Sequence, residues 1–368
     1  IGKDTRRSSY MFEYSLVGGL VASGADAYML HVTTTPSVAY VCRTENFDCG
    51  IMISASHNPV EYNGIKFFDN QGYKLSDELE DEIEDIMMSR PEILPSPTGI
   101  GLGTKGYAEE ALDDYLAFLT KTTTEKFGGI KVALDCANGA AYKAAPLAML
   151  DLGAQLCIIH NEPDGTNIND KCGSTHMDDL KAMVVENGAD IGFAFDGDAD
   201  RCLAVDEKGN LIDGDKILAI CGLDMKQRGC LEKDTIVGTV MSNLGLTMMG
   251  RENGIEILQT AVGDRYVLER MLADGYNIGG EQSGHIIIPE YMTTGDGELS
   301  ALMLIESMKL SGKKASELKK VMRVYPQVMV NIEATPEMKA KLDDPEVKSY
   351  LDENFKEKIN VEELCFIF

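Results

Sequence analysis

The sequence predicts an α/β protein of three similar domains with mixed sheets, and three observations support this prediction. Short apolar segments of strand length alternate with segments of helical periodicity, the pattern that is typical of βαβ units. This alternation starts again at Ile130 and at Thr235. The chain has 368 residues, too many for one ordinary hydrophobic core.

Each unit is expected to alternate helices and strands. In the first we expect helix Tyr10–Ala22, strand Ala27–Val32, helix Pro36–Arg43 and strand Gly50–Ile53. In the second we expect strand Ile130–Leu134, helix Ala141–Leu150 and strands Gln155–His160, Ile191–Phe195 and Cys202–Val205. In the third we expect strand Thr235–Val240, helix Leu244–Arg251, strand Ile255–Gln259 and a strand ending at Ile278.

Composition shifts suggest where these units end. Pro91–Gly106 is rich in proline and glycine and is interpreted as a linker, with helix Ala108–Thr120 after it. A second break is expected at Lys226–Lys233, and strand Val328–Ile332 is expected to open a fourth unit. The predicted domains are 1–106, 107–228, 229–325 and 326–368. Acidic Asp77–Asp85 is interpreted as a solvated helix face.

Charge and composition exclude several classes of function. A net charge of −26 argues against nucleic acid or an anionic membrane as partner, because both need a basic surface. It leaves a small anionic substrate open, since salt screens remote charges. No apolar run approaches the roughly 20 residues of a membrane-spanning helix. Nine cysteines without a Cys-x-x-Cys pair suit buried small hydrophobes in a reducing compartment, so a cytoplasmic location is expected.

Two motifs are set aside. Gly101–Gly106 matches Gly-x-Gly-x-x-Gly, but Pro95-Ser-Pro97 precedes it where a dinucleotide site needs a strand. The segment from Asp196 resembles the start of a Ca²⁺ EF-hand loop, but Arg201 stands where that loop needs glycine. The sequence therefore still permits a metal site at Asp196, but it excludes a dinucleotide-binding site at Gly101.

Asp196, Asp198 and Asp200 are the predicted metal ligands. They occupy alternate positions in a turn between two apolar strands, where their mutual repulsion is unfavourable unless a cation is bound. Carboxylate oxygens select Mg²⁺, Mn²⁺ or Ca²⁺, and three of them leave coordination positions open for catalysis. A solvated acidic loop is the alternative.

Ser56 is the predicted nucleophile. It follows the strand that ends at Ile53, with His57 beside it and Pro59 stiffening the turn. Lys66 supplies a cation suited to a phosphorylated serine. An ordinary polar turn and a serine hydrolase are the alternatives. Against the hydrolase, adjacent Ser56 and His57 would point apart on an extended backbone, and no Gly-x-Ser-x-Gly elbow is present.

Glu281, Ser283 and His285 alternate after the strand that ends at Ile278. On an extended segment they would share one face, which suits binding of sugar hydroxyls, with His285 also a candidate for proton transfer. A solvated strand face is the alternative.

Taken in order, the segments Ser54–Pro59, Asp196–Arg201 and Gly280–His285 resemble the α-D-phosphohexomutase superfamily. Further matching segments are Asp135–Ala140, Cys172–His176, Gly263–Tyr266 and Thr293–Gly297. The resemblance extends over almost the whole chain to about residue 332. Gln282 and the segment Gly263–Arg265 look most like those of the bacterial phosphoglucosamine mutases.

The resemblance implies three α/β domains around a central cleft, with a fourth domain truncated. It also implies a mutase that interconverts glucosamine 6-phosphate and glucosamine 1-phosphate through phosphorylated Ser56 and a bisphosphorylated sugar. Mg²⁺ would bind Ser56 and the three aspartates, and a sugar bisphosphate would activate the enzyme by phosphorylating Ser56.

Roles for the other residues follow from the same resemblance. Lys66, Arg201 and Arg265 would neutralise phosphate charge, while Glu281, Ser283 and His285 would bind the sugar. His57 and Asn58 would orient the loop Ser54–Pro59 that carries Ser56, called the serine loop below. Either Lys66 or His285 would transfer a proton. The small-molecule partner would be a hexosamine or hexose phosphate, and a homodimer is left open.

The family pattern also has two segments that this sequence lacks: a glycine-rich one with an arginine upstream of Ile1, and a phosphate-binding loop in the fourth domain. The activity of this chain is therefore uncertain at this point. A phosphomannomutase/phosphoglucomutase and a catalytically impaired fragment that binds metal and sugar phosphate are the alternatives.

Overall fold

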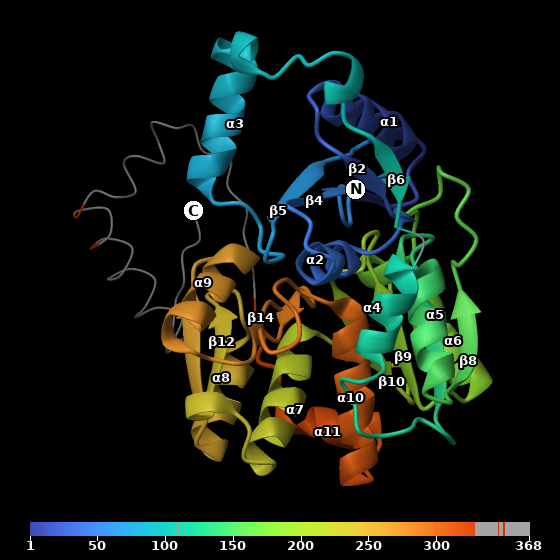
Figure 1. Ribbon diagram of the computed structural model, residues 1–368. Coiled ribbons are helices and arrows are strands. Elements are labelled where there is room, and N and C mark those ends of the chain that lie inside the picture. The colour runs from blue at the N-terminus through green and yellow to red at the C-terminus, as the bar shows by residue number, and fades with distance from the viewer. Residues whose placement is uncertain (109, 328–344, 346–348, 350–368) are drawn as a thin grey trace.

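The computed structural model describes residues 1–108, 110–327, 345 and 349, and Figure 1 shows its architecture. Three four- or five-stranded sheets follow one another along the chain, and helices pack on them. We call the parts that contain them domains I, II and III. The expected strand Val328–Ile332 and nearly all of the expected fourth domain lie outside the described residues.

Domain I has strand order β3-β1-β4-β5, in which only β4 and β5 are antiparallel. Its elements are β1 (Gly2–Lys3), α1 (Arg7–Ala22), β2 (Ala27–Met29), β3 (His31–Val32), α2 (Thr35–Thr44), β4 (Cys49–Ile53), β5 (Ile65–Asp69) and α3 (Asp77–Ser89). Helix α3 has no buried residue and projects away from the sheet, which confirms the solvated acidic helix (Figure 1).

Two predictions for domain I need correction. The expected strand Ala27–Val32 is divided, because the backbone turns left-handed at His31 with φ 59°. Its first part, β2, joins a different sheet, where it pairs in parallel with β6 (Lys105–Tyr107). The expected linker therefore ends in a strand, and apart from that strand it holds only the short turns η1 (Pro91–Ile93) and η2 (Gly99–Gly101).

Domain II has strand order β11-β10-β9-β7-β8, with β8, β7 and β9 parallel and the rest antiparallel. Its elements are α4 (Ala111–Leu119), β7 (Lys131–Asp135), α5 (Ala141–Asp151), β8 (Gln155–Ile159), η3 (Gly173–Thr175), α6 (Asp178–Asn187), β9 (Ile191–Phe195), β10 (Cys202–Asp206) and β11 (Leu211–Ile212). The strands on both sides of the acidic turn are present as predicted, so the turn is not an EF-hand loop.

Domain III repeats this plan with strand order β13-β12-β14-β15, in which only β14 and β15 are antiparallel. Its elements are α7 (Gly214–Gln227), η4 (Glu232–Asp234), β12 (Thr235–Thr239), α8 (Leu244–Asn253), β13 (Glu256–Thr260), α9 (Asp264–Asp274), β14 (Gly279–Gly280), β15 (Ile286–Ile287), α10 (Gly297–Ser311), α11 (Ala315–Leu318) and η5 (Lys319–Val321). The predicted class, three similar α/β domains with mixed sheets, is confirmed.

The helices α7 and α10 connect domains II and III. Every residue of α10 from Gly297 to Met308 is buried, and the helix packs on α7, α5 and β10. Helix α7 packs on α8, β12 and β14, all of which belong to domain III. We therefore propose that domain III begins before α7 rather than at residue 229. No described helix has both the length and the apolar character to cross a membrane.

Asp215, on α7, is expected to make the stability of the protein depend on pH. Its Oδ2 accepts a 2.7 Å hydrogen bond from the Asn243 N–H at the start of α8, while burial raises its pKa to about 6. The folded protein therefore binds more protons than the unfolded chain between pH about 4 and 6. Through Asp215, the free energy of unfolding is expected to fall by about 3 kcal/mol across that window as pH rises, and buried Asp296, whose pKa is also raised to about 6, adds to the slope.

Denaturant unfolding at a series of pH values measures this slope, and Asp215→Asn is expected to make it less steep by the contribution of Asp215. The exposed residue Asp81, on α3, provides the matched variant Asp81→Asn, which is expected to retain the slope. A slope that is equal in the two variants would exclude Asp215 as its source.

Candidate active site

The three predicted metal ligands lie together in one tight turn. Strands β9 and β10 pair from Phe195 to Cys202, so the residues between them close a short loop. Asp196, Asp198 and Asp200 are buried, and one oxygen of each lies within 4.8 Å of the others. Burial raises the pKa of Asp196 well above its usual range, and repulsion from Asp200 and Asp198 adds to the effect. A bound cation would relieve this repulsion.

Two oxygens of this triad suit an ion in particular. Asp198 Oδ1 and Asp200 Oδ1 are buried, and neither has a hydrogen-bond partner among the described residues. Carboxylate oxygens are the ligands that Mg²⁺, Mn²⁺ and Ca²⁺ prefer. The residues present therefore fit a hard divalent cation.

Ser56 contacts the triad directly. It follows β4 of domain I, and its Oγ donates a 2.5 Å hydrogen bond to Asp196 Oδ2 in domain II. The Ser56 N–H donates to Ser54 Oγ at 3.0 Å, and the Ser56 backbone is left-handed with φ 51°. Residues other than glycine adopt this conformation rarely, and it is concentrated at functional sites. The local backbone thus brings the serine hydroxyl to the aspartates.

His57 does not point away from Ser56, and that expectation is wrong. The left-handed turn places His57 Nδ1 3.3 Å from Ser56 Oγ. The pair still does not resemble that of a hydrolase, because the serine hydroxyl donates to Asp196 and Arg201 Nη1 lies 3.1 Å from the same His57 nitrogen. Burial, and then the charge of Arg201, lower the pKa of His57. Its predicted role in orienting the loop stays a prediction.

Arg6, which no motif in the sequence distinguishes, holds the serine loop in place. The Arg6 side chain is fully buried, and its guanidinium donates to the carbonyls of Pro59, Asn58 and Ser56 at 2.5, 2.8 and 3.0 Å. Arg6 Nε donates to buried Asp4 Oδ2 at 2.7 Å. Burial raises the pKa of Asp4, while the charge of Arg6 opposes the rise. Arg6, held by Asp4, thus fixes three carbonyls of the loop backbone.

Asn169, which no motif distinguishes either, holds the same loop from domain II. Its side-chain amide donates to the Ser56 carbonyl at 2.8 Å and to the Asn58 carbonyl at 3.0 Å. The loop is therefore held between domain I and domain II. The carbonyls of Ser56 and Asn58 each accept from both Arg6 and Asn169, which fills their hydrogen-bonding capacity.

Asn169→Gly is expected to lower the free energy of unfolding by about 1–3 kcal/mol, because two hydrogen bonds of about 0.5–1.5 kcal/mol each are lost while Arg6 still donates to both carbonyls. Glycine suits the left-handed backbone at Asn169, which has φ 56°, so the change tests the amide rather than strain. Denaturant unfolding measures the loss. Exposed Asn46 has a similar φ of 55°, and Asn46→Gly is the matched control. Equal losses in both variants would contradict the assignment.

The predicted cations Lys66 and Arg201 lie at the triad. Lys66, on β5, donates to Asp198 Oδ2 at 2.6 Å and to Asp200 Oδ2 at 3.0 Å. Burial alone would lower the pKa of Lys66, but the two carboxylates outweigh it and raise the pKa. The Arg201 N–H donates to Asp196 Oδ1 at 3.2 Å, and its guanidinium lies 3.9 Å from Asp200. Positive charge is thus available where a phosphoryl group would sit on Ser56.

The expected extended segment after Ile278 is a tight turn instead. Strands β14 and β15 pair in antiparallel orientation, and the Gly284 N–H donates to the Glu281 carbonyl at 3.0 Å to close the turn between them. Glu281 accepts from the Gly263 N–H at 3.2 Å and from Ser283 Oγ at 3.4 Å. Glu281 and Ser283 therefore remain neighbours, although not as residues of one strand face.

His285 is buried next to Asp200 of the turn 196–200. It is 2% exposed, its Nδ1 lies 3.7 Å from Asp200 Oδ1, and its Nε2 accepts from the Gly295 N–H at 3.0 Å. Such burial suits a residue that positions Asp200 and does not suit direct contact with a sugar. Of the two candidates for proton transfer, Lys66 is therefore the more accessible, with 22% of its side chain exposed.

Arg265 is not brought to the triad. It lies near the start of α9, where its guanidinium pairs with Glu269 at 2.8 Å and with Asp77 at the start of α3. Its predicted role at a phosphate would require that pair with Asp77 to open. The neighbouring residue Asp264 pairs with Lys74 and lies 3.4 Å from His285, so it links domain I to the buried histidine.

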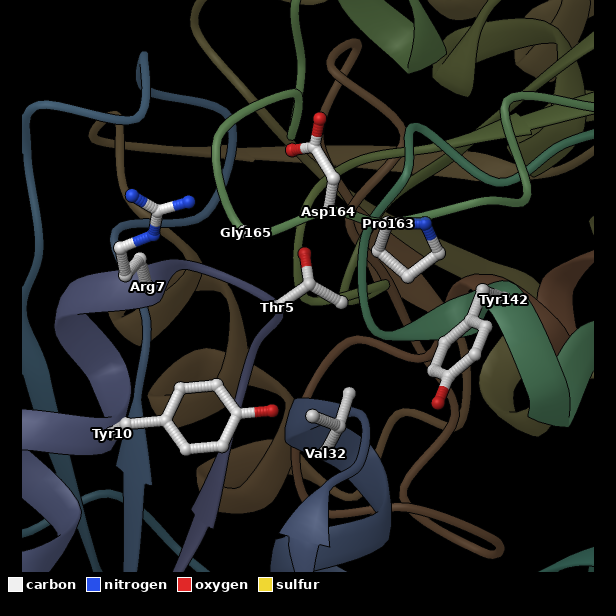
Figure 2. Close-up of a pocket in the computed structure, with 8 residues that line it drawn as sticks. All are labelled: Thr5, Arg7, Tyr10, Val32, Tyr142, Pro163, Asp164 and Gly165. Carbon is white, nitrogen blue, oxygen red and sulfur yellow. The ribbon is translucent and has the colours of Figure 1, made fainter.

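A pocket of about 280 Å³ lies apart from these residues (Figure 2). It is lined by Arg7 and Tyr10 of α1, by Tyr142 of α5, and by Thr5, Val32, Pro163, Asp164 and Gly165. None of the predicted site residues lines it. The candidate active site is therefore assigned from side-chain chemistry and contacts.

Comparisons with protein families match the three domains in order. The three matches are to phosphoglucomutase/phosphomannomutase α/β/α domain I over residues 1–93, domain II over residues 113–209 and domain III over residues 213–325. They cover most of the chain.

Two curated proteins and one solved structure that resemble this chain are named as phosphohexose mutases or members of their family. The chain is 55% identical over 360 residues to a phosphoglucosamine mutase of Ruminiclostridium cellulolyticum, covering 97% of this chain and 80% of the relative. It is 54% identical over 347 residues to a phosphoglucosamine mutase of Acetivibrio thermocellus, covering 94% of this chain and 77% of the relative. Among solved structures, a phosphoglucomutase/phosphomannomutase family protein of Burkholderia thailandensis matches with a TM-score of 0.76 at 25% identity, covering 87% of this chain and 70% of that one.

Proposed function

The chain belongs to the phosphoglucomutase/phosphomannomutase family of the α-D-phosphohexomutase superfamily, and from this premise we propose that it is a phosphoglucosamine mutase. The proposed reaction interconverts glucosamine 6-phosphate and glucosamine 1-phosphate. The names of the relatives support this choice of substrate. The observation that carries the proposed chemistry is the contact between Ser56 Oγ and Asp196, which joins a nucleophilic hydroxyl to a carboxylate triad.

Asp196, Asp198 and Asp200 would hold Mg²⁺ together with an oxygen of phosphorylated Ser56. When bound, the ion would withdraw charge from the phosphoryl group as a Lewis acid. The buried oxygens of Asp198 and Asp200 without a hydrogen-bond partner among the described residues support this assignment.

In the proposed transfer, the free hydroxyl oxygen of the sugar phosphate bonds to phosphorus while the bond from phosphorus to Ser56 Oγ breaks. Little covalent chemistry is needed, so positioning and charge balance carry the rate. Lys66 and Arg201 would balance the charge of the moving group, and Arg6 and Asn169 would keep the loop in place. The bisphosphorylated sugar then turns over and returns its other phosphoryl group to Ser56.

The sugar would contact the turn between β14 and β15. Glu281 and Ser283 offer a carboxylate and a hydroxyl to sugar hydroxyls, while buried His285 would act through Asp200. Lys66 would relay the proton: its ammonium would give one proton to the departing Ser56 Oγ and take up the one released by the sugar hydroxyl, so it stays charged. Arg265 would reach a phosphate after leaving Asp77.

Mass spectrometry after incubation with Mg²⁺ and glucose 1,6-bisphosphate tests the proposal, because a sugar bisphosphate should phosphorylate the resting serine. One phosphate is expected on the peptide that contains Ser56, and Asp198→Asn is expected to reduce it strongly. Asp178 lies on an exposed helix turn, so Asp178→Asn is the matched control. A folded chain that binds Mg²⁺ and gains no phosphate would instead support a non-catalytic fragment.

Rates with glucosamine, glucose and mannose 6-phosphates separate this function from the related phosphomannomutase/phosphoglucomutase activity. Glucosamine 6-phosphate is expected to give the highest kcat/KM. A preference for mannose or glucose phosphate would move the assignment to the other branch of the same family. We further propose a cytoplasmic location, and a homodimer stays a prediction.

A further inference from the structure

A second group of metal-ligating side chains lies in domain II, beside the acidic triad. Asp135 ends β7, His160 follows β8, and Cys172 precedes η3. Strands β7 and β8 are parallel, so their carboxyl ends lie at one edge of the sheet and bring these segments together. One ligand atom of each of the three residues lies within 4.8 Å of the others.

Two of these atoms form a close ion pair. His160 Nδ1 is 3.0 Å from Asp135 Oδ2, although the angles fall outside those of a hydrogen bond, and His160 Nε2 lies 3.3 Å from Asp179 Oδ2. The contact with Asp135 raises the pKa of His160, so a bound cation would have to take the place of a proton there. Ligand atoms about 2.0–2.2 Å from a tetrahedral Zn²⁺ are about 3.3 Å apart. The separation of these two atoms is therefore close to the one that a shared ion requires.

The backbone holds the cluster in place. Asp135 accepts from the Ala137 N–H through Oδ1 and from the Gly173 N–H through Oδ2, both at 2.9 Å. The His160 carbonyl accepts from the Asn138 N–H at 2.7 Å. Such contacts orient metal ligands before the ion arrives and are typical of the surroundings of metal sites.

The ligand set differs in chemistry from the triad. One thiol, one imidazole and one carboxylate suit Zn²⁺ and similar cations, whereas oxygen-only sites suit Mg²⁺. Cys172 is fully buried, and burial raises its pKa to about 12, so its thiol stays protonated without a cation. Binding would release that proton to solvent and would therefore tighten as pH rises. The His160 side chain is 24% exposed, which gives a path for the ion and for a water as fourth ligand.

We propose that Asp135, His160 and Cys172 form a site for Zn²⁺ or a similar thiophilic divalent cation, separate from the Mg²⁺ site. Asn169 lies between His160 and Cys172 in the chain, and its amide holds the Ser56 and Asn58 carbonyls. A bound ion would fix both ends of this segment and so hold the serine loop more firmly. The site itself does not depend on the proposed mutase activity.

Co²⁺ is the probe for this site, because a cysteine thiolate bound to Co²⁺ gives a charge-transfer absorption in the near ultraviolet that carboxylate ligands do not give. Titration of the full chain in excess Mg²⁺, which occupies the triad, is expected to produce this absorption with one Co²⁺ per chain, and Zn²⁺ should displace it. Cys172→Ser is expected to abolish the absorption, and His160→Gln to weaken Co²⁺ binding more than about tenfold.

Two controls make the outcome decisive. Cys230 is exposed, and Cys230→Ser should leave the absorption unchanged. Asp198→Asn should also leave it unchanged, which separates this site from the triad. No thiolate absorption in the folded wild-type chain, or an absorption that survives Cys172→Ser, would overturn the proposal. Circular dichroism confirms that each variant is folded, and the His160→Gln titration provides a second reading if Cys172→Ser unfolds.

Discussion

Ser56→Ala is expected to abolish phosphoryl transfer while leaving the chain folded. Alanine has no oxygen to carry the phosphoryl group, so turnover should fall by at least about 10⁴-fold, as in other enzymes that lose a covalent nucleophile. The expected structural loss is small, because Ser56 Oγ contributes one hydrogen bond to Asp196 and lies near His57. A coupled assay of glucosamine 1-phosphate formation measures the effect.

The control is Ser89→Ala at the exposed end of α3, which should retain full activity. Thermal unfolding should place Ser56→Ala within a few degrees of the wild type. Turnover above about a hundredth of the wild-type rate would rule out Ser56 as the phosphoryl carrier, and the triad would then need a different nucleophile.

Arg6→Met is expected to lower the free energy of unfolding by about 3–5 kcal/mol, the largest stability effect that we foresee. The guanidinium holds three loop carbonyls, and its removal leaves the Asp4 carboxylate buried without its cationic partner. Because burial raises the pKa of Asp4, the folded variant would take up a proton there more readily than the unfolded chain. The loss should therefore shrink as pH falls.

Denaturant unfolding at neutral and acidic pH measures this effect. Arg7, the next residue, is exposed, so Arg7→Met provides a matched control at the adjacent position. Arg6→Lys should give an intermediate loss, because an ammonium keeps the charge but lacks the planar fork. A difference of less than about 1 kcal/mol between Arg6→Met and Arg7→Met would show that the loop does not depend on this side chain.

The sequence predicted elements with clear periodicity and missed those without it. Strand Ile191–Phe195 was predicted with the bounds that the structure has, since five apolar residues between turn signals leave little choice. Strand β1 has two residues, and no motif distinguishes the buried pair Asp4 and Arg6 that follows it. Its parallel pairing with β4 is what brings Arg6 to the serine loop, and such pairing is a tertiary property.

Two errors at the site have local causes. The alternation of Glu281, Ser283 and His285 predicts an extended segment, but Gly284 has φ 94° and closes a turn. The orientation of His57 was derived from an extended backbone, whereas Ser56 has φ 51°. Both depend on positive φ values. A glycine can adopt positive or negative φ, so its presence alone does not predict which one occurs. A serine adopts a positive φ only when the surrounding structure imposes it.

The serine loop also has a consequence for how the chain folds. Arg6 can reach residues 56–59 as soon as domain I is complete, but Asn169 and Asp196 lie 113 and 140 residues beyond Ser56. Contacts over such separations form late, because a long loop must close first. During synthesis from the N-terminus, the hydroxyl of Ser56 thus reaches its carboxylate partner only after most of domain II has been made. In a nascent chain, the first domain would be folded while Ser56 still lacked its contact with Asp196. Phosphoryl transfer would begin only once the second domain had folded against the first.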